Sequence, residues 1–158
     1  MEGNEIRKED LIIRNYRTSD YEETLEILKQ LDGKYDIGFD ESKWRKSSGL
    51  RQFKPNLKRI TLIAESKETG ELMGMGMIEG VKDSLGQFTG YLDNWATKRK
   101  FIGKNVGKFI TEGAIHILRS WGCETIRINL GYRSDKKLLD IFGKVGFKPV
   151  FIVLEKRF

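Results

Sequence analysis

An amphipathic segment over residues 105–121 constrains the fold of this chain more than any other feature. Strand-like segments lie on either side of it, at 87–98 and 124–130. Two strands joined by a helix usually pair in parallel through a right-handed crossover, so the chain needs a sheet with a parallel pair. The apolar residues of the segment recur with the i, i+3, i+4 spacing of a helix that buries one face: Val106, Phe109, Ile110, Gly113, Ala114, Ile117, Leu118 and Trp121.

The remaining segments predict further strands and helices around that unit. Residues 59–65 and 72–80 have strand character, and together with 87–98 they predict three consecutive antiparallel strands joined by short turns. We therefore predict the α+β class, with a mixed central sheet of six to seven strands flanked by helices. The other predicted elements are a strand at 11–16, a helix at 18–31, a short helix within 39–53, a helix carrying Leu138, Ile141, Phe142 and Val145, and a last strand over 147–158.

Length and composition indicate one ordinary globular domain. The 158 residues suit a single domain over 1–158, with residues 1–10 as a mobile tail. The first ten residues lack the apolar core of a signal peptide, and no stretch approaches the ~20 apolar residues of a membrane span. A single cysteine forms no intrachain disulfide, and with a single histidine it makes no metal-ligand cluster. We expect a cytoplasmic protein without a metal or a membrane partner.

A cationic turn precedes the amphipathic helix. Residues 98–108 carry five cations and no acid, and Gly103 and Gly107 lie where the loop becomes helix. A helix N-terminus offers unpaired N–H groups and partial positive charge, and glycine lets the backbone approach a bulky ligand. The segment matches neither the phosphate-binding P-loop nor the dinucleotide fingerprint. These features predict a site for an anionic ligand, phosphate above all.

The chain resembles the GCN5-related N-acetyltransferase (GNAT) family over residues 11–158. That family carries a [QR]-x-x-G-x-[GA] turn after its fourth strand, which aligns with residues 102–107; Ile102 stands for the Arg or Gln, and Asn105 for the first glycine. Asparagine tolerates the left-handed conformation better than other non-glycine residues, so we expect the turn to survive. A later family helix carries N-x-x-A-x-x-x-Y before a Gly-Phe pair, which here reads Asp135, Leu138 and Phe142 before Gly146 and Phe147.

The resemblance implies acetyl-CoA as cosubstrate. In the family the amides of the turn bind the pyrophosphate, and the pantetheine arm lies between the fourth and fifth strands where these splay apart. Carried onto this chain, the cofactor-binding residues are Trp95, Ala96, Thr97, Ile102, Gly103, Lys104, Asn105, Val106, Gly107, Lys108, Asp135 and Phe142.

The resemblance also implies transfer of the acetyl group to a primary amine by direct attack in a ternary complex. A carboxylate or a water chain removes the proton of the amine, and Glu79 and Asp93 are the candidate bases. Tyr132 is a candidate donor to the departing thiolate. Phe142 replaces the tyrosine that often serves the family as general acid, but a thiolate with a pKa of roughly 8.5 can leave with little protonation.

The sequence leaves the activity, the acceptor and the oligomeric state open. Because Ile102, Asn105 and Phe142 depart from the family pattern, the chain also fits a catalytically weak module that binds CoA or a macromolecular partner. A nucleic-acid binder would use the basic run, but the chain carries no known nucleic-acid-binding signature, so we do not expect one. The acceptor is open among polyamines, amino sugars, amino acids and protein amines. The apolar last strand can also pair with a second copy as a homodimer.

Overall fold

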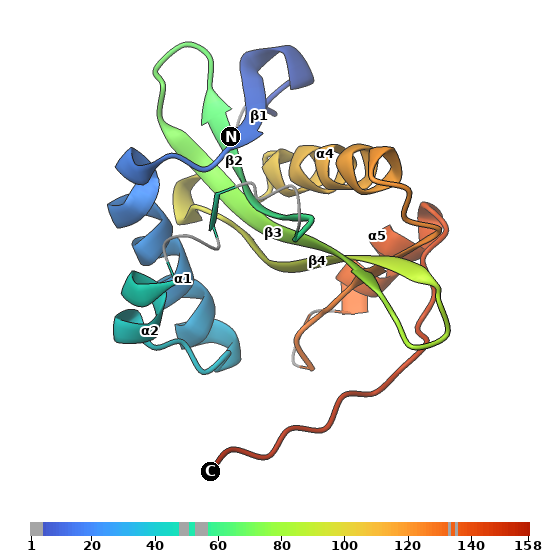
Figure 1. Cartoon of the computed structure of the whole chain (residues 1–158). Helices are drawn as coiled ribbons and strands as arrows, with labels where there is room; N and C mark the ends of the chain where they lie inside the picture. Colours follow the sequence, from blue (N-terminus) through green and yellow to red (C-terminus); the bar gives the residue numbers. More distant parts are fainter. Residues whose placement is uncertain (1–4, 48–50, 53–56, 133, 135) are drawn as a thin grey trace.

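The computed structural model of the chain describes residues 5–47, 51–52, 57–132, 134 and 136–158. No helix among these residues is both long enough and apolar enough to cross a membrane. Short 3-10 turns precede β1, α1 and α4. The helices are α1 (Tyr21–Tyr35), α2 (Glu41–Lys46), α4 (Val106–Ser120) and α5 (Lys136–Lys144), and the strands are β1 (Leu11–Asn15), β2 (Arg59–Ser66), β3 (Leu72–Lys82), β4 (Phe88–Thr97) and β5 (Thr125–Ile128) (Figure 1).

The strands form one mixed sheet. Their order is β1-β2-β3-β4-β5, with antiparallel pairing from β1 to β4. The last pair, β4 with β5, is parallel from Thr89↔Thr125 to Leu92↔Ile128. The α+β class and the parallel pair predicted around the amphipathic helix are confirmed.

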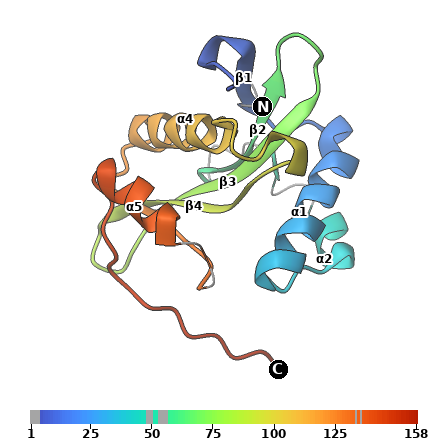
Figure 2. The same cartoon turned by 180° about the vertical axis from the view of Figure 1, so that it is seen from behind.

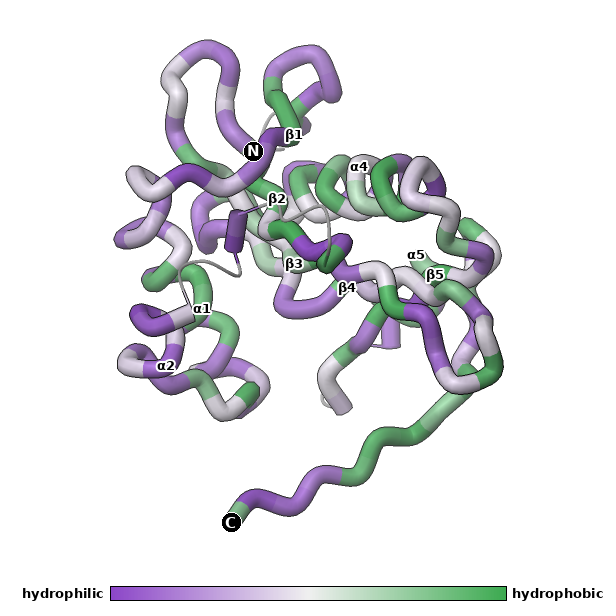
Figure 3. The backbone as a smooth tube through the Cα atoms, viewed as in Figure 1, coloured by the Kyte–Doolittle hydropathy of each residue, from purple (hydrophilic) through white to green (hydrophobic). Residues whose placement is uncertain are grey.

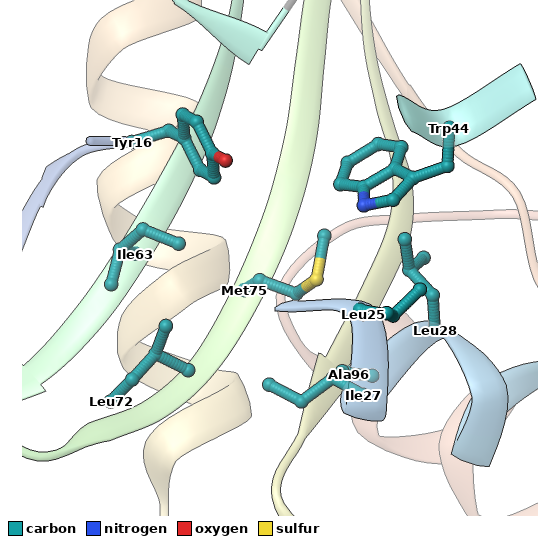
Figure 4. Packing of buried hydrophobic residues seen from close by; sticks show 9 residues of the cluster. All are labelled: Tyr16, Leu25, Ile27, Leu28, Trp44, Ile63, Leu72, Met75 and Ala96. Carbon is teal, nitrogen blue, oxygen red and sulfur yellow. The ribbon is translucent and has the colours of Figure 1, made fainter. Parts of the chain in front are cut away.

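Helices cover both faces of the sheet. Helices α1 and α2 lie on one side and α4 on the other (Figures 1 and 2). On the first side, Ile27 and Leu28 of α1 and Trp44 of α2 pack with Ile63 and Met75 of the sheet (Figure 4). On the second side, the buried stripe of α4 packs on the sheet through Ala114 and Leu118, against Leu62, Ile78 and Leu92.

The predicted number of strands was wrong. Among the described residues the sheet has five strands, not six to seven, and the predicted last strand over 147–158 does not form. This segment instead runs from α5 past the sheet and ends near α1 without a strand partner (Figures 1 and 3). Its β-branched and aromatic residues favour an extended backbone, but a strand forms only where a neighbouring edge pairs with it.

The residues before β1 contact the turn that opens α4. The structure describes the predicted N-terminal tail from Glu5 onward, and Lys8–Asp10 form a 3-10 turn. Ile6 packs against the buried cluster that contains Leu11 and Val106, and its backbone N–H donates to the carbonyl of Lys104 at 3.2 Å. This contact fixes one side of the turn.

Gly74 of β3 gives a test of the packing under α4. A Cβ built there would lie 2.9 Å from the carbonyl oxygen of Ala96 and 2.9 Å from Cδ1 of Ile110. We expect Gly74→Ala to lower the free energy of unfolding by about 1–3 kcal/mol, because the backbone of β4 must shift. Gly33→Ala is the matched control: a Cβ there meets nothing within 4 Å, so the same change in α1 should be neutral or stabilising. Urea denaturation measures both, and equal effects would contradict the packing.

Candidate active site

Strands β4 and β5 separate partway along the sheet. Their pairing ends at Leu92↔Ile128, whereas β4 continues along β3 to Thr97↔Gly74. Where the two strands part, the register of β4 on β3 shifts, and Asn94 has a positive φ of 46°. A bulge of this kind bends a strand and leaves backbone groups outside the ladder. Residues 93–97 therefore present one backbone edge that β5 does not cover.

The turn before α4 has the conformation expected from the sequence. Gly103 has φ of 78°, and Asn105 is left-handed with φ of 70° and ψ of 2°. The predicted tolerance of Asn105 for the glycine position is therefore confirmed. The N–H of Phe109 donates to the carbonyl of Asn105 at 3.2 Å, and the amides that precede it belong to the first turn, where a helix has no internal acceptors. These amides are available to an anion.

Gly107 faces the unpaired stretch of β4. A Cβ built at this position would lie 3.7 Å from Oγ1 of Thr97 and 3.7 Å from Cζ3 of Trp95, which are ordinary contacts. The protein itself therefore has room for a side chain at 107. The glycine leaves open a surface shared by the first turn of α4 and the end of β4.

The structure divides the cationic run of residues 98–108 into two groups. Nζ of Lys98 lies 3.3 Å from a carboxylate oxygen of Glu23, and Lys100 pairs with Glu71. These two lysines hold the end of β4 against α1 and the β2–β3 turn. In the part of the chain that the structure describes, no ion pair holds the other three cations, Arg99, Lys104 and Lys108.

The two candidate bases, Asp93 and Glu79, lie on the same face of the sheet as α1, beyond the part of that face on which α1 packs. Asp93 stands opposite Met77, which packs against the α1 cluster, and Glu79 lies two residues further along β3. Glu79 is ion-paired with Arg59 of β2. Asp93 instead accepts a hydrogen bond from the side-chain amide of Asn129, just beyond β5. Of these two carboxylates, Asp93 is therefore the one that has no cationic partner in the described part of the chain.

Burial raises the pKa of Asp93 above the usual value of 3.8 for an aspartate. The negative charge of Glu79 raises this pKa further, whereas the hydrogen bond from Asn129 lowers it. A carboxylate whose pKa is raised takes up a proton more readily, which suits a general base. Asp93 lies beside the unpaired stretch of β4, where β4 and β5 separate.

Several predicted site residues contribute backbone rather than side chains. The side chains of Ala96 and Val106 are buried in the core, so only their backbone groups can meet a ligand. Ile102 is exposed, and the side chain of Tyr132 is fully exposed beyond β5. Asp135 lies outside the described residues.

Phe142 acts as an anchor for α5. It is buried, and its ring meets Trp95 of β4 edge to face at a centroid distance of 5.6 Å. A second edge-to-face contact, at 5.7 Å, joins it to Phe147. Phe142 therefore fixes α5 next to the predicted cofactor surface by packing, and it offers no hydroxyl group there.

The sequence reasoning missed Arg127 and Asn129. Arg127 stands opposite Tyr91 in the β4–β5 ladder and donates a hydrogen bond to its hydroxyl at 3.2 Å. The two-residue period of strands is the signal that could have identified them. Tyr91 and Asp93 lie on one face of β4, and Arg127 and Asn129 lie on the same face of the sheet, on β5 and just after it. In the described chain no carboxylate pairs with Arg127, whose guanidinium lies 4.6 Å from the ring centroid of Phe151.

Comparison with known proteins identifies the family of the chain. A profile of the acetyltransferase (GNAT) family matches residues 18–147. The chain belongs to this family, and acetyl transfer is the activity of the class. The search of curated proteins gave no match.

Solved structures show the same fold. The glucosamine-6-phosphate N-acetyltransferase of Arabidopsis thaliana has 22% identity and a TM-score of 0.72, covering 94% of this chain and 98% of that one. An acetyltransferase of Trypanosoma brucei has 20% identity and a TM-score of 0.73, covering 94% and 100%. An aminoglycoside acetyltransferase from an uncultured soil sample has 11% identity and a TM-score of 0.67, covering 96% and 97%.

Proposed function

We propose that this protein is an N-acetyltransferase that moves the acetyl group of acetyl-CoA to a primary amine by direct attack in a ternary complex. The observation that carries the proposal is the open surface at Gly107, which joins the free amides of the α4 turn to the unpaired edge of β4. The family match over residues 18–147 supports the reaction class.

The residues present fit acetyl-CoA. The amides at the start of α4 suit its pyrophosphate, and Arg99, Lys104 and Lys108 add positive charge around the turn. The backbone groups of residues 95–97 that face away from β3 offer hydrogen bonds to the amide groups of the pantetheine arm, although the carbonyl of Thr97 already accepts one from Nε2 of Gln30 at 3.1 Å. When bound, acetyl-CoA supplies the activated acetyl group.

In the proposed mechanism, Asp93 accepts the proton of the amine. The neutral nitrogen then bonds to the thioester carbon, the carbon–sulfur bond breaks, and the sulfur leaves as thiolate, which takes up the further proton that the nitrogen must lose to give the amide. Backbone N–H groups on the uncovered edge of β4 stabilise the charge that develops on the carbonyl oxygen. Tyr132 remains a proposed donor to the thiolate, although its side chain is fully exposed beyond β5. Glu79 is held by Arg59 and serves as a minor electrostatic contributor.

Within the amines, we propose an acceptor that carries an anionic group. Asp93 suits the ammonium end, and Arg127 on the same face, without a carboxylate partner in the described chain, suits a phosphate or carboxylate. Amino-sugar phosphates meet this requirement, and the Arabidopsis thaliana structure is named for one of them. Glucosamine 6-phosphate is therefore the first acceptor to test, with glucosamine as its uncharged counterpart.

Arg127→Gln tests this assignment. We expect KM for glucosamine 6-phosphate to rise roughly ten- to a hundredfold, the size of one charge-assisted hydrogen bond, with KM for glucosamine unchanged. Steady-state measurement of acetylated product with each acceptor separates the two effects. An equal change for both acceptors would show that Arg127 acts on the fold of the site rather than on the anion.

A second candidate function is a module that binds CoA or a partner with little turnover. Phe142 favours it, because the position that carries a tyrosine hydroxyl in the family is filled here by a ring packed on Trp95. Calorimetric titration with acetyl-CoA, followed by a screen of amines for CoA release, distinguishes the two. Binding with turnover supports the transferase, and binding without turnover across the screen supports the module.

A further inference from the structure

The side chain of Gln30 reaches from α1 to the uncovered edge of β4. Its Nε2 donates a hydrogen bond to the backbone carbonyl of Thr97 at 3.1 Å, and both residues are partly buried. The N–H of Lys98 donates to the carbonyl of Met73 in β3 at 2.8 Å, so the alternation of an antiparallel strand directs the carbonyl of Thr97 away from β3. Gln30 therefore bonds to a backbone group on the edge that β5 leaves uncovered.

The donor on this edge is a side-chain amide, the same chemical group as the amides of the pantetheine arm. An amide N–H of either kind can donate to the carbonyl of Thr97. In the proposed function the backbone groups of this edge bind the cofactor. One donor from α1 and one from the ligand are then directed at the same backbone acceptor.

A cavity of about 290 Å³ beside Gln30 gives its side chain room to move. Gln30 lines this cavity together with Glu26 and Ile27 of α1 and with Lys98 and Arg99, which follow β4. A water molecule takes a share of about 30 Å³ in the liquid, so the cavity is large enough to receive the end of a glutamine side chain. The carboxylate and the cations of the lining offer polar partners to a displaced amide. Gln30 can therefore leave the edge of β4 by rotation of its side chain alone.

Other contacts hold α1 in place independently of Gln30. Glu23 lies seven residues before Gln30, two turns along the same face of α1, and its carboxylate lies 3.3 Å from Nζ of Lys98. The side chain of Lys98 is mostly buried, and this ion pair uses no backbone group of β4. Ile27 and Leu28 anchor the same helix in the core. Helix α1 can therefore stay on the sheet when the amide of Gln30 leaves the backbone.

We propose that Gln30 is a placeholder for the cofactor: its amide holds the carbonyl of Thr97 until an amide N–H of the pantetheine arm replaces it. The replacement keeps this partly buried carbonyl paired before and after binding, whereas an unpaired carbonyl would destabilise either state. Because the ligand must displace an existing hydrogen bond, Gln30 weakens cofactor binding. This inference rests on the proposed function, since it takes the pantetheine arm as the ligand of this edge.

Calorimetric titration of Gln30→Leu tests the placeholder. We expect its affinity for acetyl-CoA to rise roughly three- to tenfold, because the ligand then pairs a carbonyl that the variant leaves unpaired. Adenosine 3′,5′-bisphosphate, the nucleotide of CoA without the pantetheine arm, should bind both proteins equally. Gln87→Leu is the matched control: Nε2 of Gln87 donates to Oγ1 of Thr125 at 3.0 Å, at the other end of β4, so its loss should leave both affinities unchanged. Equal or weaker binding of acetyl-CoA by folded Gln30→Leu would overturn the proposal.

The side-chain amide resonance of Gln30 in a proton–nitrogen NMR spectrum gives a second readout, and its loss in Gln30→Leu identifies it. We expect acetyl-CoA, but not the bisphosphate, to shift this resonance and to speed the exchange of its protons with water. A carbonyl oxygen can accept two hydrogen bonds, so an unchanged resonance in the acetyl-CoA complex would show that Gln30 stays on Thr97 and would refute the placeholder alone. A folded wild-type protein that binds no acetyl-CoA would instead contradict the proposed function, and this inference with it.

Discussion

Replacing Gly107 with valine is expected to weaken acetyl-CoA binding by roughly a hundredfold or more, a loss of at least about 2.7 kcal/mol. The branched side chain would occupy the surface between the first turn of α4 and the end of β4, where the pantetheine arm and pyrophosphate are proposed to lie. Calorimetric titration measures the change directly. Gly33→Val, in the last turn of α1, is the matched control: it is also a helical glycine with open space around it, and it should leave affinity unchanged.

The fold of the Gly107→Val variant should persist. A Cβ at this position meets its nearest protein neighbours at 3.7 Å, and the loss of a glycine from a helix offsets part of any crowding. The free energy of unfolding should change by less than about 1 kcal/mol. If the folded variant bound acetyl-CoA as tightly as wild type, the assignment of the turn to the cofactor would be wrong.

The second large effect is expected for Asp93→Asn, which should lower kcat by roughly 10²- to 10³-fold, within the range typical of a lost general base. Asparagine keeps the oxygen that accepts from Asn129 and removes only the charge and the proton affinity. Acetyl-CoA affinity should stay the same, because Asp93 lies on the acceptor side of the sheet. Product formation at saturating acceptor, measured by mass spectrometry, reports the loss.

Glu79→Gln is the control for Asp93→Asn. Glu79 lies on the same face, but its carboxylate is held by Arg59, so its loss should cost less than about tenfold in kcat. A larger effect at Glu79 than at Asp93 would reverse the assignment of the base.

The dependence of kcat/KM on pH tests the assignment of Asp93 as the general base. Asp93 must be ionised to act, so kcat/KM should fall as the pH drops through its pKa, which burial places above 3.8. Removing the hydrogen bond in Asn129→Ala removes an effect that lowers this pKa, so the acid limb of the profile should move to higher pH. A shift to lower pH would contradict the role of Asn129.

The same raised pKa has a consequence for stability. A carboxyl group whose pKa is higher in the folded state than in the unfolded state stabilises the fold at pH below the unfolded value, and loses that contribution as the pH rises through the folded value. At neutral pH the charged Asp93 therefore lowers the free energy of unfolding. Asp93→Asn should unfold at the same temperature as wild type or a higher one, while losing activity.

Local periodicity was enough to predict most of the elements. Strands β2, β3, β4 and β5 and helix α4 each begin and end within two residues of the predicted positions, because alternation and the 3.6-residue period are local properties of the sequence. The failure at 147–158 has a physical cause. Strand preference depends on a neighbouring edge, and no local pattern reveals whether the edge of β5 is reached by the same chain.

In the candidate site too, local features were predictable from the sequence, whereas contacts between distant segments were not. Gly103 and Asn105 form a local turn directly before α4, and the left-handed conformation of Asn105 was predictable from the residue type. The pairing of Lys98 and Lys100 with acids from α1 and from the end of the β2–β3 turn was not visible, because their partners lie far away in the chain. The same holds for Glu79 with Arg59 and for Asp93 with Asn129, and only the strand register distinguishes the two carboxylates.

The most direct test of the central claim is the amount of free CoA and acetylated amine formed by the wild-type protein from acetyl-CoA and glucosamine 6-phosphate. We predict equal amounts of the two products, dependent on enzyme and strongly reduced in Gly107→Val when acetyl-CoA is kept near the dissociation constant of the wild-type protein. A folded wild-type protein that neither binds acetyl-CoA nor forms product with any amine in the screen would contradict the account.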